Sequence, residues 1–309
     1  MAIQTMAECG PIGTGAARAV AFGGGGEWFM AWMVGYAQGL RDAGVDLAAA
    51  DVTLGTSAGS FVGAAIKGGR LDDLGQALAA LGANPQDANA ELHITTGAPS
   101  QVRAQQVMGG TTEISPATLQ AIGRAAMAAH NAPDAAYDAS VQTLLGLTSW
   151  PTGHHTTATD CYTAESVIVG PNDGIPIAQA ATASSSLPGV NGPTWLDDRL
   201  CMDGGVSASS THATMLSGAS FVLIIGMFDF ATHPPAHVNP SFGIAERCNP
   251  GTADREAASL RSGGSTVHVA IANPDPTTNF MSAAEIGPAM ADGRTRGKAD
   301  AAVLAPHWS

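Results

Sequence analysis

The amino-acid sequence predicts an α/β fold in which a mostly parallel sheet is covered by helices on both faces. Three observations support this prediction. Strand-like and helix-like patterns alternate along the chain, glycine-rich turns join them, and the clearest strand, at 220–226, is apolar over most of its length. With 309 residues, 45% of them apolar and 13% charged, the chain can bury a sizeable core. We therefore expect one globular domain.

Two strand-turn-helix units open the pattern. In the first unit, a short buried strand leads through four glycines into a long helix, which is apolar nearly all round and is therefore expected to be central. In the second unit, a strand leads through a serine flanked by glycines into a helix of small residues. In chain order, the predicted elements are a strand at 18–22, glycines at 23–26, a helix at 27–43, a strand at 52–54, a turn at 55–59 and a helix at 60–67.

The pattern changes between residues 84 and 153. This stretch predicts short helices rich in Ala and Gln, with little strand character, broken by Pro85, Pro99, Pro116, Pro133 and Pro151. We interpret it as a helical insertion or lid. The alternation then resumes, with helices predicted near 178–184 and over 282–304, and strands at 155–160, 166–169, 200–202, 220–226 and 266–271.

Composition and charge exclude several classes of function. A formal net charge of -13 disfavours broad contact with nucleic acid phosphates, whereas transient contact with a membrane surface through an apolar patch stays compatible with it. There is no calcium-loop motif, and no zinc-ligand spacing among Cys9, Cys161, Cys201 and Cys248, so we expect no metal ion or cofactor. We expect a cytoplasmic protein, because neither a secretory signal nor a run of the ~20 apolar residues of a spanning helix is apparent.

Residues 55–59, Gly-Thr-Ser-Ala-Gly, fit the GxSxG pattern of a nucleophile elbow. In such an elbow a strand turns sharply into a helix and lifts the serine hydroxyl above the sheet edge, while the glycines relieve the crowding. The setting between a Val/Leu strand and a small-residue helix agrees with this interpretation. Ser57 is therefore the candidate nucleophile, and an ordinary glycine-rich turn is the alternative.

The glycine run at 23–26 is the candidate oxyanion hole. Backbone N–H groups of consecutive glycines beside an elbow serine, here those of Gly24, Gly25 and Gly26, can meet the negative charge of a tetrahedral intermediate. A tight turn or a phosphate-binding loop is the alternative. The second of these is weakened because Trp28 stands where a GxGxxG match needs its last glycine, and no Gly-Lys-Ser/Thr follows.

Asp203-Gly204-Gly205 follows a short predicted strand. An aspartate at this point can accept the serine proton if burial or a like charge brings its pKa toward the working pH. On its own, Asp-Gly-Gly is usually a turn. The order glycine run, elbow, Asp-Gly-Gly favours Asp203 as the candidate general base.

In that order the three segments resemble the patatin-like phospholipase family, in particular its bacterial branch. Similar stretches are Gly-Leu-Arg-Asp-Ala-Gly-Val at 39–45, Ala-Ser-Ser-Ser-Leu-Pro-Gly-Val at 183–190, and the basic, Gly-containing residues 293–298. The resemblance implies a three-layer α/β/α sandwich over residues 15–305, with 84–153 as its insertion or lid. It also implies a Ser57–Asp203 dyad without histidine, and an oxyanion hole formed by the amides of Gly24, Gly25 and Gly26.

Two departures from the family pattern bear on the site. Glu27, Trp28 and Phe29 stand where the family loop usually closes on a small residue with a basic side chain nearby. The stretch 207–214 also lacks the Asn that relatives commonly carry. Because of the first departure, we do not expect a basic side chain to stabilise the oxyanion or to bind a phospholipid head group.

The resemblance implies a lipid acyl hydrolase of the phospholipase A or esterase type, acting on a lipid or acyl ester without a cofactor. An acyltransferase that uses the same acyl-enzyme is the nearest variant, and a lipid-binding relative without turnover is a second alternative. A third is an α/β-hydrolase with a Ser-His-Asp triad that draws its histidine from His212, His233, His237, His268 or His307. Only two predicted strands precede Ser57, which argues against the triad.

Overall fold

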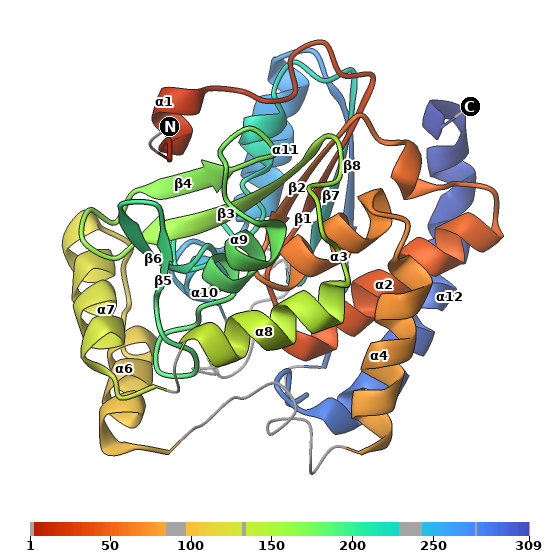
Figure 1. Ribbon diagram of the computed structural model, residues 1–309. Helices are drawn as coiled ribbons and strands as arrows, with labels where there is room; N and C mark the ends of the chain where they lie inside the picture. The colour runs from red at the N-terminus through yellow and green to blue at the C-terminus, as the bar shows by residue number, and fades with distance from the viewer. Residues whose placement is uncertain (1–2, 85–96, 132–133, 229–242, 276, 309) are drawn as a thin grey trace.

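The computed structural model describes residues 3–84, 97–131, 134–228, 243–275 and 277–308 (Figure 1). Within these residues eight strands form one sheet, in which hydrogen-bonded pairs follow the path β5-β6-β3-β2-β1-β7-β8 and β4 also pairs with β3. Strands β2 and β6 pair with successive residues along the same edge of β3. Strands β3, β2, β1, β7 and β8 are parallel, while β4, β5 and β6 join by antiparallel pairing. The mostly parallel sheet is therefore confirmed. The strands are β1 Arg18–Phe22, β2 Val52–Thr56, β3 His154–Asp160, β4 Ser166–Val169, β5 Thr194–Leu196, β6 Arg199–Asp203, β7 Phe221–Gly226 and β8 Thr266–Ile271.

The helices around this sheet are α1 Met6–Cys9, α2 Gly26–Asp42, α3 Ala58–Lys67, α4 Leu71–Ala83, α6 Pro99–Gly109, α7 Pro116–Ala128, α8 Asp134–Leu145, α9 Ile177–Ser184, α10 Ile244–Cys248, α11 Thr252–Ser262 and α12 Ile286–Trp308. Short 3-10 segments are η1 Leu47–Ala49, η2 Ala213–Leu216 and η3 Ala283–Glu285. Among the described helices, none combines the length and the apolar character needed to cross a membrane.

The predicted elements agree closely with the observed ones. Strands β1, β4 and β8 have the predicted bounds, β2 continues two residues further to Thr56, and the last helix begins at Ile286 rather than at Ser282. The prediction did not include α1, α4, α10, α11 or β5. Strand β5 has three residues and α11 is mainly polar, so both give weak periodic signals. Helix α4 was overlooked although its leucines recur at helical spacing.

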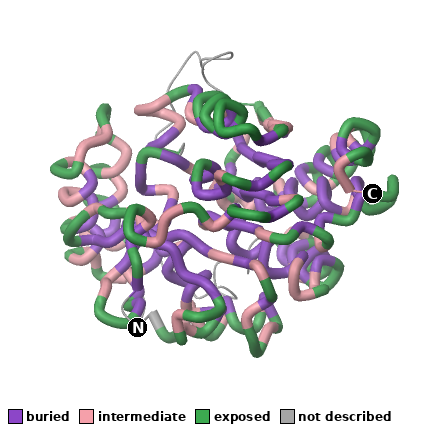
Figure 2. Tube along the Cα trace, turned by 90° about the horizontal axis from the view of Figure 1, so that it is seen from above, coloured by how far each residue is buried: buried purple, intermediate pink, exposed green. Residues whose placement is uncertain are grey.

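Both faces of the sheet are buried, because successive strand residues point to opposite sides. In β1, Val20 and Phe22 belong to a core cluster with α2, α3, α4 and α12, whereas Ala19 and Ala21 belong to a second cluster with η2 and α11. Figure 2 shows buried residues in the middle of the molecule and exposed ones mainly at its periphery. Helices therefore cover the sheet on each side, which confirms the predicted α/β/α sandwich.

The C-terminal helix α12 packs directly on α2 through glycines of both helices. A Cβ on Gly35 or Gly293 would lie 2.0 Å from a carbonyl oxygen of the other helix, and one on Gly39 or Gly297 would lie 2.2 Å away. Any larger residue would force the two backbones apart. Helix α12 thereby holds α2, which begins in the glycine run, against the sheet.

The stretch 84–153 contains α6, α7 and α8 and, within its described residues, no strand, as predicted. Pro99 and Pro116 are the first residues of α6 and α7, where the missing N–H would have no intrahelical partner. Pro85 and Pro133 lie outside the described residues. Helix α7 packs beside β6, whereas α8 packs on α9. Helix α7 thus lies beside the strand that ends at Asp203, and α8 lies on the helix that ends at Ser184.

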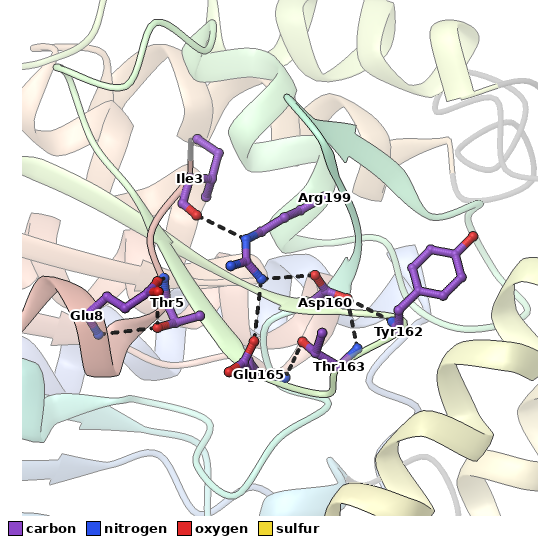
Figure 3. Close-up of polar contacts among 8 residues, drawn as sticks. All are labelled: Ile3, Thr5, Glu8, Asp160, Tyr162, Thr163, Glu165 and Arg199. Atoms are coloured by element: carbon purple, nitrogen blue, oxygen red, sulfur yellow. Dashed lines mark hydrogen bonds and ion pairs between the residues drawn. The ribbon is translucent and has the colours of Figure 1, made fainter. Parts of the chain in front are cut away.

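Arg199, the first residue of β6, ties the N-terminal segment to the antiparallel end of the sheet (Figure 3). Its Nε donates to the carbonyl oxygen of Ile3 at 3.0 Å, and its Nη1 pairs with Asp160 at 3.1 Å and with Glu165 at 3.5 Å. The Asp160 carboxylate also accepts two backbone N–H groups of the β3–β4 turn. Strand β6 is thereby held at its first residue, while Asp203 is its last.

Candidate active site

Strands β2 and β6 meet end to end along one edge of β3. Thr56 of β2 pairs with Thr157, and Asp203 of β6 pairs with the next residue, Ala158. Strand β4 occupies the opposite edge over the same residues. Because β2 is parallel to β3 and β6 is antiparallel to it, the C-terminal ends of β2 and β6 converge. Ser57 follows Thr56 directly, so the sheet brings this serine to the aspartate.

Ser57 lies in a strained turn between β2 and α3. Its backbone has φ 51° and ψ -120°, a conformation that residues other than glycine rarely adopt. The turn is tight because α3 approaches the sheet closely: a Cβ on Gly55 would lie 2.5 Å from the carbonyl oxygen of Gly59, and one on Gly59 would lie 2.2 Å from that of Phe22. The backbone N–H of Ser57 donates to Ser184 Oγ at 2.9 Å. Both glycines of the GxSxG pattern are therefore required by contact with backbone.

Ser57 Oγ donates a hydrogen bond to Asp203 Oδ2 at 2.7 Å. The other carboxylate oxygen, Oδ1, accepts the N–H of Gly205 at 2.7 Å. Asp203 is only 4% exposed, and this burial raises its pKa to about 6, against the opposing effect of the two hydrogen bonds. The nearby carboxyl group of Glu246 adds to the rise. Such a carboxylate is ionised at neutral pH and is a stronger base than an ordinary aspartate.

The glycine run lies beside the serine. A Cβ on Gly24 would lie 3.2 Å from Cβ of Ser57. The Gly24 N–H donates to the carbonyl oxygen of Ser210 at 3.0 Å and is therefore not free for a substrate. Among the described residues, the N–H groups of Gly25 and Gly26 have no acceptor, and they stand at the N-terminus of α2, where the helix dipole favours an anion. The candidate hydrogen-bond donors to an oxyanion are therefore the backbone N–H groups of Gly25 and Gly26.

Two further side chains border the site. The hydroxyl of Tyr137, from α8, lies 3.0 Å from Ser185 Oγ. Burial raises the pKa of Tyr137 to about 12, and the charges of Glu27 and Asp203 contribute to the rise, so the phenol lies near both. Glu27 is partly buried, and its Oε2 has no hydrogen-bond partner among the described residues. Burial raises the pKa of Glu27 to about 6. Sequence reasoning missed Tyr137, because nothing in the local pattern of α8 marks it.

Three of the triad candidates, His212, His268 and His307, lie among the described residues, and each contacts a group other than Ser57. His212 Nε2 donates to the carbonyl oxygen of Gly204 at 3.1 Å, and His268 Nε2 lies 3.7 Å from an Asp300 oxygen. The ring of His307 stacks on Phe221. The candidates His233 and His237 lie outside the described residues. Within the residues that the structure covers, no group of three His, Cys, Asp or Glu side chains could hold a metal ion.

Comparison with known proteins finds a matching protein family. The family model for patatin-like phospholipases matches residues 20–215, a range that includes the glycine run, Ser57 and Asp203. The chain belongs to the patatin-like phospholipase family. No curated protein matches it. A similar solved structure is VipD from Legionella pneumophila, with a TM-score of 0.43 and 13% identity, over 94% of this chain and 67% of that chain. Membership of the family supports a lipid acyl hydrolase activity in general terms.

Proposed function

We propose that this protein hydrolyses acyl esters of lipids through a dyad of Ser57 and Asp203. The observation that carries the proposal is the 2.7 Å hydrogen bond from the Ser57 hydroxyl, in a strained strand-to-helix turn, to a buried carboxylate. The amides of Gly25 and Gly26 at the start of α2, which have no acceptor within the described part of the chain, support it, because an ester carbonyl oxygen could lie there.

In the proposed reaction Ser57 Oγ attacks the ester carbonyl carbon while its proton passes to Asp203. The negative charge moves to the carbonyl oxygen, where the amides of Gly25 and Gly26 stabilise it. When the tetrahedral intermediate collapses, the bond to the alcohol breaks and the alcohol takes the proton from Asp203, leaving an acyl-serine. Water then attacks the acyl-serine as Asp203 removes its proton. Collapse breaks the bond between the acyl carbon and Ser57 Oγ, the proton returns from Asp203 to Oγ, and the fatty acid is released. If an alcohol replaces water, the same steps give acyl transfer.

We also propose that substrates without an anionic group next to the ester are favoured. The Asp203 and Glu27 carboxyl groups both have raised pKa values, and among the residues that the structure describes no cationic side chain contributes to either shift. Burial has the largest effect on each. A phosphate held beside these carboxylates would be repelled, whereas an uncharged acylglycerol would not. The proposal also includes three predictions made from the sequence: residues 84–153 act as a lid, the domain spans residues 15–305, and the protein makes transient contact with a membrane surface.

Labelling with a fluorophosphonate tests the nucleophile, because the reagent phosphonylates an activated serine. The wild type should be labelled at Ser57 and should hydrolyse a nitrophenyl ester, whereas Ser57→Ala should lose both properties with unchanged circular dichroism. Ser262→Ala, the same change on an exposed turn of α11, is the control and should behave as wild type. Full activity in Ser57→Ala would remove the basis of the proposed mechanism.

A further inference from the structure

One short segment connects the candidate base to the glycine run. Residues 204–213 begin immediately after Asp203, and the carbonyl oxygen of Ser210, near their middle, accepts the Gly24 N–H at 3.0 Å. A Cβ on Gly23 would lie 3.1 Å from a side-chain carbon of Thr211, so the two segments are in close contact. The conformation of 204–213 therefore sets the distance between the base and the amides of the glycine run.

The carboxylate of Glu256, from α11, holds this segment from the far face of the sheet. Its Oε1 accepts the hydroxyl of Ser209 at 2.7 Å, and its Oε2 accepts the hydroxyl of Thr211 and the N–H of Ala213, the latter at 3.2 Å. Ser209 Oγ in turn accepts the N–H of His212 at 2.8 Å. One carboxylate thus organises donors from four residues of the segment, three of them directly and His212 through Ser209.

The segment is also closed on its Asp203 side. His212 has φ 49°, and its side chain turns back so that Nε2 donates to the carbonyl oxygen of Gly204 at 3.1 Å. Ser207 Oγ donates to the same carbonyl oxygen at 2.9 Å. The residue that follows the base is therefore linked, through His212 and Ser209, to Glu256.

The Glu256 carboxylate is costly to bury. The residue is 7% exposed, and within the described part of the chain it forms no ion pair, so that its charge is balanced by neutral donors alone. Burying a charge without a counter-ion opposes folding. A polar network kept at such a cost is rigid once all its donors are satisfied. This rigidity is what two catalytic elements on different segments require.

We propose that Glu256 is a positioning residue, which fixes Asp203 and the glycine run relative to each other through residues 204–213. The inference rests on the proposed function but goes beyond it, because Glu256 lies outside the dyad and touches neither Ser57 nor Asp203. Its effect is greatest when charge develops on the substrate oxygen, because Asp203 and the glycine amides must then both be correctly placed around the reacting ester. Loss of Glu256 should therefore lower turnover more than it weakens substrate binding.

The test is Glu256→Gln, which keeps the shape of the side chain and removes its charge and one acceptor oxygen. For a nitrophenyl ester, kcat should fall about 10- to 100-fold, while KM changes less than about threefold. Titration with a fluorophosphonate counts the intact sites, so that kcat can be given per labelled Ser57. Ser209→Ala removes one of the three donors to Glu256 and the acceptor of the His212 N–H, leaves the Thr211 and Ala213 donors in place, and should lower kcat per site by about threefold to tenfold. Glu113→Gln, the same change on an exposed loop, is the control.

The outcomes separate this inference from the proposed function. If the wild type is not labelled at Ser57, the proposed function fails and the inference fails with it. If the wild type is labelled and both variants keep wild-type kcat per labelled site, Glu256 serves folding alone and the inference is overturned. If a variant has fewer labelled sites but an unchanged kcat per site, Glu256 again serves folding alone and the inference is overturned. Should Glu256→Gln not fold, the kcat per site of Ser209→Ala decides.

Discussion

The two halves of the candidate dyad are held in different ways. Ser57 is fixed by backbone shape, through a positive φ and two glycines that pack against the backbone of β1 and α3. Asp203 is fixed by polar contacts, through the Ser57 and Gly205 hydrogen bonds and the buried network that follows it. The serine therefore tolerates no added atoms nearby, whereas the aspartate tolerates no lost donors or acceptors. Each half should fail under a different kind of substitution.

The largest expected effect comes from Asp203→Asn. The amide cannot accept the serine proton, so kcat should fall about 10³-fold, while His268→Ala and His212→Ala keep activity within about tenfold of wild type. The measurement is kcat for a nitrophenyl ester, with the fold checked by circular dichroism. Each of the six described histidines, and also His233 and His237, should be replaced by alanine in turn and assayed in the same way. One indispensable histidine in a folded variant would replace the dyad with a triad.

The pH profile gives an independent check on Asp203. In the proposed mechanism the Asp203 carboxylate is the base, and this form is populated above its pKa, which burial raises to about 6. Activity should therefore increase about tenfold per pH unit below pH 6 and level off above it. The profile should be the same in His268→Ala. A midpoint that moves with one histidine substitution would contradict this assignment.

The next effect concerns the serine half. Gly59→Ala places a methyl group where the carbonyl oxygen of Phe22 would be 2.2 Å away, so α3 must move from the sheet and carry Ser57 with it. We expect a loss of about 3 kcal/mol in the free energy of unfolding and about 10²-fold in kcat. The matched control is Gly287→Ala, at a helical position with open space, where stability should change by less than about 1 kcal/mol. Chemical denaturation measures both. Equal stability in the two variants would contradict the close-contact account of the elbow.

The same contrast explains which features could be predicted from the sequence. The elbow, the glycine run and the strand ends follow from local patterns, because strand periodicity and glycine spacing are properties of neighbouring residues. The support of the base depends on Glu256, 53 positions after Asp203 in the chain and on the other face of the sheet, and no local pattern marks it. Tyr137 was missed for the same reason. The occupied N–H of Gly24 follows from its contact with Ser210, which again joins distant segments.

The smallest effect should come from Glu27→Gln, which tests whether the acidic surroundings of the site select substrates. Glu27 follows the glycine run directly, and burial raises its pKa to about 6, so its carboxyl group is charged above pH 6 and neutral below. A unit charge about 4 Å from a phosphate changes the free energy of that phosphate by about 1 kcal/mol in water.

Two lipids with the same acyl chain, a monoacylglycerol and a lysophosphatidic acid, separate this effect from catalysis itself. At pH 8 the wild type should release fatty acid from the uncharged lipid with the higher kcat/KM, and Glu27→Gln should narrow that preference about threefold to tenfold. Comparing wild type and Glu27→Gln at the same pH cancels the titration of Asp203, which is common to both proteins. Because Glu27 is largely protonated at pH 5, wild type and variant should there show the same ratio. Glu113→Gln should leave the preference unchanged at both pH values. A preference that is the same in wild type and Glu27→Gln at pH 8 would show that Glu27 does not face the substrate.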